Sequence, residues 1–172
     1  RQSFHHLDNH FYDYLLILSG DQLYQMDFSE MLKIHKEKES DVSVATIPVN
    51  GEQATGFGIM KNNNEGMITD FVEKPDPDDV PNWKSEVPDE LVEQGREYLA
   101  SMGIYIFNRT TINQLFEDNP EATDFRKEII PKDIEQNLKV SSYQYDGYWT
   151  DIGTIKSFFE ANLELTDPLP EF

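Results

Sequence analysis

At residues 15–21 the chain reads Leu15-Leu16-Ile17-Leu18-Ser19-Gly20-Asp21, an apolar run that ends in a carboxylate. Residues 14–18 carry no charge and no alternation of polar and apolar side chains, which is typical of a strand buried on both faces. Gly20 lets the backbone turn, so Asp21 follows the carboxyl end of the strand, where open α/β sheets bind ligands. The alternative is an aspartate that only caps a turn, and this short string alone does not exclude it.

A helix and a second strand follow. Asp27-Phe28-Ser29-Glu30 resembles a capping box, and apolar residues at helical spacing predict a helix that runs to about Lys38. Residues 42–49 are rich in β-branched side chains and indicate a strand. Strand, helix and strand form a parallel crossover unit. We therefore expect an α/β fold with a mixed, mostly parallel sheet and flanking helices.

The rest of the chain alternates between predicted strands and helices. Residues 56–61 and 67–73 flank an Asn-rich turn that ends in Gly66, so they predict a hairpin. Residues 75–97 contain four prolines and predict a long loop. Further strands are expected at residues 99–107 and 140–145, and helices at residues 1–10, 110–117, 125–134 and after the cap residue Thr154.

Composition excludes several classes of function. The 172 residues, about one domain, carry a net charge of −19, and such an acidic surface repels phosphate backbones, so we expect no nucleic-acid partner. No stretch approaches the ~20 apolar residues of a membrane helix, so we expect no membrane partner. The absence of cysteine excludes disulfides and Cys-based zinc sites, which agrees with a cytoplasmic location. We expect structural roles for all four histidines, His5, His6, His10 and His35.

Two aspartates, Asp21 and Asp151, each stand close to a glycine at the end of an extended apolar or aromatic segment. Two carboxylates from different strands can hold one Mg²⁺, which keeps its other positions for water and substrate phosphates. Asp151 alone could instead be an acidic residue that favours the N-terminus of the helix after Thr154.

Two further segments carry residues suited to a phosphorylated sugar. Glu73 and Lys74 end a strand just before Pro75; a carboxylate can accept sugar hydroxyls, and an ammonium suits a phosphate. Ser101 and Gly103 lie on one face of the next predicted strand, where small residues often allow close approach of a ligand, and Gly58 has the same property. The alternatives are a solvated strand end and a tight contact between strands.

Taken in chain order, these motifs resemble those of ADP-glucose pyrophosphorylases, the glucose-1-phosphate adenylyltransferases of bacterial and plant glycogen and starch synthesis. The resemblance covers almost the whole chain and rests on Ser19-Gly20-Asp21, Gly58, Glu73-Lys74-Pro75, Ala100-Ser101-Met102-Gly103 and Tyr148-Trp149-Thr150-Asp151-Ile152-Gly153-Thr154. It implies part of a Rossmann-like nucleotidyltransferase domain and the reaction of ATP with glucose 1-phosphate to give ADP-glucose and pyrophosphate, with Mg²⁺.

The resemblance also implies a role for each motif residue. Asp21 and Asp151 would hold the metal, with Asp21 the more critical for catalysis. Lys74 would bind the phosphate of glucose 1-phosphate, and Glu73, Ser101 and the backbone at Gly58 would contact the glucose. Positioning and charge neutralisation supply most of the catalysis in such a phosphoryl transfer.

The chain also departs from the family pattern. The glycine-rich loop that holds the triphosphate and the C-terminal β-helix domain are both missing, so the resemblance implies the second, sugar-binding half of the catalytic domain, without its N-terminal strands. We expect residues 1–165 to form this half and residues 166–172 to begin a linker, and we expect the chain alone to be inactive. Gln22 replaces a common histidine, and Arg126 a common glycine.

These departures leave alternatives open. The full-length protein could use UDP- or dTDP-glucose chemistry, because the missing half would choose the base. It could also be a non-catalytic regulatory subunit, although the presence of Asp21 argues against lost catalysis. The family resemblance implies a homo- or hetero-tetramer.

Overall fold

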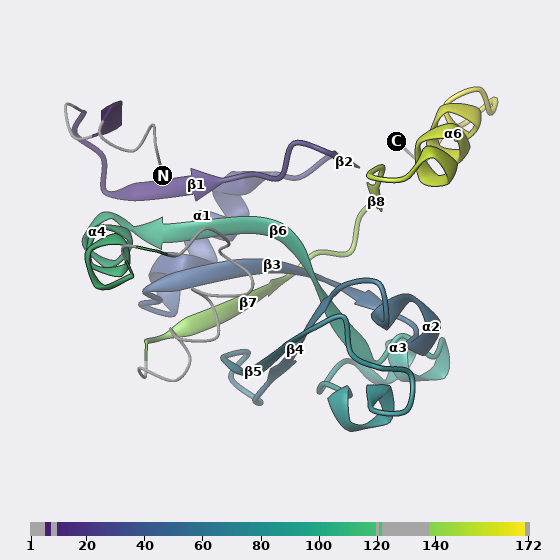
Figure 1. Ribbon diagram of the computed structural model, residues 1–172, viewed down its shortest axis with the longest axis horizontal. Helices are drawn as coiled ribbons and strands as arrows, with labels where there is room; N and C mark the ends of the chain where they lie inside the picture. Colours follow the sequence, from purple (N-terminus) through teal and green to yellow (C-terminus); the bar gives the residue numbers. More distant parts are fainter. Residues whose placement is uncertain (1–5, 8–9, 120, 122–137, 171–172) are drawn as a thin grey trace.

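The computed structural model describes residues 6–7, 10–119, 121 and 138–170, and its centre is a six-stranded sheet (Figure 1). The strand order is β5-β4-β6-β3-β7, and β1 also pairs with β6. The strands are β1 (Tyr14–Ile17), β3 (Val42–Val49), β4 (Gly58–Asn62), β5 (Ile68–Glu73), β6 (Tyr98–Asn108) and β7 (Val140–Gln144). The α/β class predicted from the sequence is confirmed.

The expectation of a mostly parallel sheet is wrong. Only β3 and β7 pair in parallel, whereas the other ladders of this sheet are antiparallel. β1 and β3 do run parallel to each other, as the crossover unit predicts, but β6 lies between them and is antiparallel to both. The hairpin of β4 and β5 and the segment after it return the chain so that β6 enters in the opposite direction.

The helices surround this sheet. Asp27 caps α1 (Phe28–Glu37) by accepting a hydrogen bond from the Ser29 amide, although in the described structure Glu30 does not complete the predicted capping box. The predicted loop at residues 75–97 contains a short 3₁₀ turn, η2 (Val80–Trp83), and one turn of helix, α3. The other helices are α2 (Gly51–Ala54), α3 (Asp89–Glu93), α4 (Arg109–Asp118) and α6 (Ile155–Glu164). The predicted helix at residues 125–134, and most of the one at residues 1–10, fall outside the described residues.

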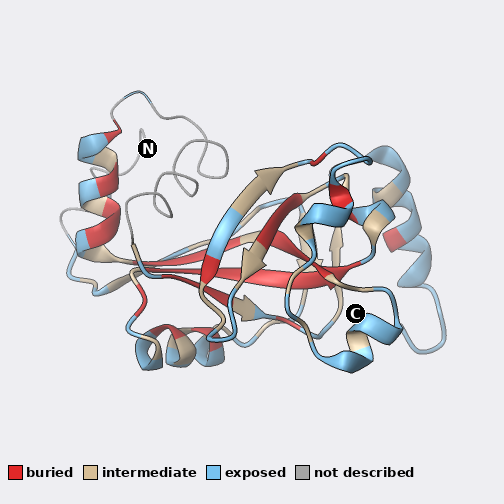
Figure 2. Cartoon of the chain, turned by 90° about the horizontal axis from the view of Figure 1, so that it is seen from below, coloured by how far each residue is buried: buried red, intermediate tan, exposed pale blue. Residues whose placement is uncertain are grey.

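The core fills both faces of the sheet, because every residue of β3 is buried (Figure 2). One face buries Ala45, Ile47 and Val49, and the other buries Val42 and Val44. β1 is less covered than the sequence predicts: Leu16 is 37% exposed. β1 pairs with β6 along one edge only, which accounts for this difference.

A separate two-stranded sheet stands at one end of the molecule, beside α6 and away from α4 (Figure 1). It pairs β2 (Gln22–Tyr24) with β8 (Trp149–Asp151) in antiparallel fashion. Segments about 130 residues apart in the sequence thereby meet. No described helix is both long and apolar enough to cross a membrane.

Candidate active site

Asp21 and Asp151 lie together at the small sheet. Gln22 pairs with Asp151 in the ladder, and the Ile152 amide donates to the Asp21 carbonyl oxygen at 3.0 Å. A Cβ atom at Gly153 would lie 2.9 Å from Asp151 Oδ1 and 3.5 Å from Asp21 Oδ2. Both carboxylates therefore converge on the space that the missing side chain of Gly153 leaves open.

Short hydrogen bonds orient the two carboxylates. The Ser19 hydroxyl donates to Asp21 Oδ1 at 2.7 Å, and the Gly153 amide donates to Asp151 Oδ1 at 2.8 Å. These bonds leave the second oxygen of each carboxylate without a hydrogen bond among the described residues. Among the described residues, no histidine, cysteine or further acidic residue joins the two aspartates as a third potential metal ligand. This donor set fits Mg²⁺, which proteins usually bind through one or two carboxylates while water and substrate phosphates complete the shell.

Glu73, Gly58 and Ser101 form a row across the main sheet. Gly58 pairs with Glu73, and the pairing of Ile59 with Ala100 brings Gly58 next to Ser101. Thr46 of β3 continues the row because it pairs with Ser101. Paired residues share a face of the sheet, so the three predicted sugar-contact residues lie on one face.

The carboxylate of Glu73 has an open hydrogen-bonding position. Its Oε2 atom is buried and has no hydrogen-bond partner in the described structure. A Cβ atom at Gly58 would lie 2.9 Å from this oxygen and 2.8 Å from the Phe71 ring, so only glycine fits there. Buried polar atoms without a partner are rare because they cost free energy, and a ligand hydroxyl could satisfy this one.

Lys74 follows the row in a strained backbone conformation. Its φ angle is +50°, in the left-handed region that residues other than glycine rarely adopt. Its backbone amide donates a hydrogen bond to the Phe57 carbonyl oxygen at 3.0 Å. Backbone strain of this kind is concentrated at functional sites, where the surrounding structure maintains it. The Lys74 side chain is exposed.

Two contacts join the row to the aspartate pair. Ser101 Oγ accepts from the Gly103 amide at 3.3 Å, and a Cβ at Gly103 would lie 3.2 Å from the Cβ of Ser19, whose hydroxyl binds Asp21. The rings of Phe57 and Trp149 meet edge to face with centroids 5.3 Å apart. The predicted residues thus form two groups, connected by these bridges.

The bridges involve residues that the sequence reasoning did not assign to the site. Trp149 Nε1 donates to Gln22 Oε1 at 3.2 Å, which ties β8 to the residue after Asp21. Trp149 lies within the motif at residues 148–154, and Gln22 directly follows the motif at residues 19–21. Their positions in the sequence could therefore have indicated that they belong to the site. Phe57 precedes Gly58 and had no signal of its own.

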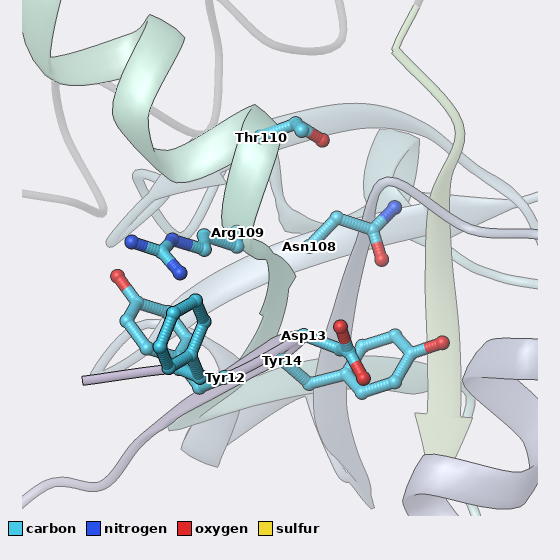
Figure 3. A pocket seen from close by; sticks show the side chains of 7 residues that line it. Tyr12, Asp13, Tyr14, Asn108, Arg109 and Thr110 are labelled. Carbon is cyan, nitrogen blue, oxygen red and sulfur yellow. The ribbon is translucent and has the colours of Figure 1, made fainter. Parts of the chain in front are cut away.

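One cavity adjoins this framework, and another lies away from it. One, of about 570 Å³, includes Asp151 and Trp149 in its wall. The other, of about 470 Å³, lies at the start of α4, where the Arg109 guanidinium stacks on the Tyr12 ring (Figure 3). The second cavity contains none of the predicted site residues.

Comparison with known proteins identifies the family. A family model described as "Nucleotidyl transferase" matches residues 2–168. The chain belongs to the nucleotidyl transferase family. It is also 40% identical over 163 residues to the "Glucose-1-phosphate adenylyltransferase small subunit, chloroplastic/amyloplastic" of Triticum aestivum, a match that covers 91% of this chain and 34% of the relative. The resemblance to ADP-glucose pyrophosphorylases is confirmed, and the chain spans about a third of the length of this curated relative.

Proposed function

We propose that this chain is the sugar-binding half of a glucose-1-phosphate adenylyltransferase. In that reaction a phosphate oxygen of glucose 1-phosphate attacks the α-phosphorus of ATP, the bond to the β-phosphate breaks, and ADP-glucose and pyrophosphate leave. The observation that carries the proposal is the convergence of Asp21 and Asp151 on Gly153. A Nucleotidyl transferase family member with two carboxylates at such a position has the donor set for this chemistry.

Each residue has a specific role in the proposed reaction. Asp21 and Asp151 would hold Mg²⁺, which neutralises charge on the phosphates when bound. Glu73 Oε2 accepts a hydrogen bond from a glucose hydroxyl. Ser101 and the Gly58 backbone border the same sugar. Lys74 binds the sugar phosphate as a point charge. The substrate is held in line for attack, so most of the rate comes from positioning.

Metal binding tests the core of this proposal. We expect Mg²⁺ or Mn²⁺ to bind the 172-residue chain in calorimetry, and Asp21→Asn or Asp151→Asn to weaken binding at least tenfold. Asp167→Asn, in the exposed segment after α6, is the matched control and leaves binding unchanged. Equal metal binding by all four proteins would refute the metal site.

Sugar-phosphate binding tests the second group of residues. Lys74→Met should weaken glucose 1-phosphate binding at least tenfold, whereas Lys61→Met should not. In the longer protein of which we propose this chain is a part, Asp21→Asn should abolish formation of ADP-glucose. Turnover by the 172-residue chain alone, above its Asp21→Asn variant, would contradict the expectation that the chain alone is inactive.

The same longer protein discriminates the alternatives. A nucleotide panel separates ATP from UTP and dTTP as the substrate. Full activity of an assembly in which the Asp21→Asn protein is paired with an active partner subunit would favour a regulatory role for this subunit. The Triticum aestivum relative is named a small subunit, which supports assembly with a second kind of subunit. Its name also says chloroplastic/amyloplastic, so the cytoplasmic location stays a prediction for this chain.

A further inference from the structure

The cavity of about 470 Å³ lies where β1 begins and where β6 passes into α4 (Figure 3). Its size falls in the range of about 300–1,000 Å³ that is usual for sites of small organic ligands. Its wall contains none of the residues assigned to the candidate active site. Asp21 follows the other end of β1, and α4 stands at the opposite end of the molecule from β8 and α6 (Figure 1). The cavity is therefore a separate place on the protein.

Two hydrogen-bond donors at this cavity lack a partner in the described structure. The Arg109 guanidinium lies over the Tyr12 ring, with its central carbon 4.7 Å from the ring centroid, and it joins none of the salt bridges between described residues. Tyr12 Oη is buried and has no hydrogen-bond partner there. Stacking on the ring holds the guanidinium in place. A ligand with a planar carboxylate would match its forked donors.

The carboxylate of Asp13 supplies the opposite charge. The Arg109 amide donates to the Asp13 carbonyl oxygen at 2.9 Å, so the two residues are neighbours along the backbone ladder. Their side chains nevertheless diverge: the guanidinium turns to Tyr12, whereas the carboxylate stands apart from it (Figure 3). Asp13 is exposed, and its carboxylate has no partner among the described residues. The wall thus presents one positive and one negative group, and each is free to bind a ligand.

Aromatic side chains form the apolar part of the wall. Phe11 is 103% exposed, so an apolar group that covered it would remove a large apolar surface from water. The Tyr14 ring is fixed edge to face against His35, with centroids 5.4 Å apart. Asn108 is held by its hydrogen bonds to His35 and to the Ser40 carbonyl oxygen. Part of the wall is therefore rigid before any ligand binds.

The charges restrict the class of ligand. A plain anion would meet Asp13 in the wall and the repulsion of a chain whose net charge is −19. A plain cation would meet Arg109 and leave its donors unused. A zwitterion satisfies both groups and carries no net charge for the whole protein to repel.

We propose that this cavity binds a free α-amino acid with an apolar side chain. The carboxylate of the ligand accepts hydrogen bonds from Arg109, its ammonium donates to Asp13, and its side chain packs on Phe11. Such a ligand is neither a substrate nor a product of the proposed adenylyl transfer, and the site does not depend on that reaction.

L-Phenylalanine is the probe, added to the ¹⁵N-labelled 172-residue chain. The backbone amide signals of Asp13 and Thr110 report on the cavity, since both residues lie in its wall. Three further compounds each lack one feature: N-acetyl-L-phenylalanine lacks the ammonium, phenethylamine lacks the carboxylate, and glycine lacks the apolar side chain. We expect L-phenylalanine to shift both signals and each of the three to bind at least tenfold more weakly. Inorganic phosphate should leave both signals in place.

Variants test the two charged groups. Asp13→Asn and Arg109→Gln should each weaken the binding of L-phenylalanine at least tenfold. The Asp13 side chain is exposed, so its variant tests the cavity even if Arg109→Gln does not fold. The matched controls are Asp78→Asn and Lys156→Gln, which remove the same charges at exposed positions outside the cavity wall and should leave binding unchanged.

Four results would overturn the proposal. They are no shift of either signal with L-phenylalanine, equal binding of N-acetyl-L-phenylalanine or phenethylamine, unchanged binding in Asp13→Asn, and a shift with phosphate but not with the amino acid. The titrations contain neither Mg²⁺ nor glucose 1-phosphate. The metal titrations of Asp21 and Asp151 therefore still test the proposed transferase function separately.

Discussion

Gly103 controls how closely the loop that carries Asp21 can approach the main sheet. Its φ angle is +69°, and the register of β3 against β6 shifts at this point, between Val44 and Thr46. The strand therefore bulges toward Ser19, and regular alternation of side chains is interrupted. A glycine fits because it tolerates the left-handed conformation and leaves room for Ser19.

Gly103→Ala should destabilise the protein and weaken its metal site. A left-handed alanine costs about 1–2 kcal/mol, and the new methyl group would also displace Ser19 and hence Asp21. Gly95→Ala is the matched control because Gly95 has φ +71° with nothing within 4 Å of its Cβ position. Urea denaturation and Mn²⁺ titration should show a larger loss of stability at Gly103 and a weaker metal affinity only there. An equal loss at both positions would contradict the contact with Ser19.

The aspartate pair was predictable from sequence, but the bulge that positions it was not. Asp21 and Asp151 each stand at the end of an extended segment, and although either alone could serve a turn or a helix N-terminus, the family resemblance pairs them at one metal site. The bulge depends on which strand pairs with β6 and in which register, a property of residues far apart in the chain. No local pattern around Gly103 contains that information.

His35 belongs to a closed ring of buried hydrogen bonds. Asn108 Nδ2 donates to the Ser40 carbonyl oxygen, so Asn108 Oδ1 must accept from His35 Nε2, at 3.1 Å. His35 Nδ1 then accepts from the Ser43 hydroxyl, at 2.8 Å. The Ser40 and Ser141 hydroxyls complete the ring to Ser43. This arrangement requires a neutral imidazole.

The ring predicts a loss of stability in mild acid. Burial lowers the pKa of His35 below its ordinary value of 6.5, against the opposing effects of the bond to Asn108 and of Asp41, while Lys36 lowers it further. The unfolded chain therefore binds more protons than the folded one just below pH 6.5, so the free energy of unfolding should fall as the pH decreases from 6.5 toward the folded pKa. Above pH 6.5 the contribution of His35 is fully present.

Urea denaturation between pH 7.5 and 5.5 measures this effect. His35→Gln should be less stable than the wild type at pH 7.5 because it breaks the ring, but it should lose less stability on acidification. His10→Gln, an exposed position, should keep the slope of the wild type. A wild-type slope in His35→Gln would assign the acid sensitivity to other groups.

At the scale of elements, α6 differs from the helices that cover the sheet. Ala161 is its only buried residue, and Ile155 is 91% exposed. A helix of ten residues is marginal without packing, so its N-terminal cap should matter more than usual. That cap is a capping box in which Thr154 and Ser157 bind each other's amides.

Thr154→Ala should open α6 locally. Loss of such a cap costs about 1 kcal/mol, which corresponds to a roughly fivefold faster amide exchange within residues 155–164. Asp27→Ala removes the cap of α1, but buried Met31 and His35 anchor that helix, so its exchange should change less. Hydrogen exchange followed by mass spectrometry compares the two helices. Equal increases in both would mean that packing does not protect α1.

Most individual elements were predictable from local patterns, whereas their order in the sheet was not. The capping signals at Asp27 and Thr154 and the turn before Gly66 mark real boundaries. The mostly parallel sheet was wrong because strand composition does not reveal that β6 lies between β1 and β3. Helix length and turn chemistry are local, but strand neighbours depend on the whole chain.

At the scale of the whole molecule, charge is the dominant property. The chain has 33 acidic and 14 basic residues, and the described residues form four salt bridges, two of them between side chains one helical turn apart. Exposed ion pairs contribute little, whereas a net charge of −19 repels itself in the compact state. The folded protein therefore carries an electrostatic cost that salt can reduce.

We expect NaCl to stabilise the chain against urea, an uncharged denaturant. Raising the ionic strength from 0.01 to 0.15 M shortens the screening length from about 30 to about 8 Å, so repulsion between distant carboxylates nearly disappears. Asp78→Lys, at an exposed position, reduces the net negative charge by two and should raise the urea midpoint in low salt while weakening its dependence on NaCl. Lys33→Arg preserves the charge and should behave like the wild type. A midpoint that falls with added NaCl would show that the salt bridges, rather than the excess of carboxylates, dominate the electrostatics of folding.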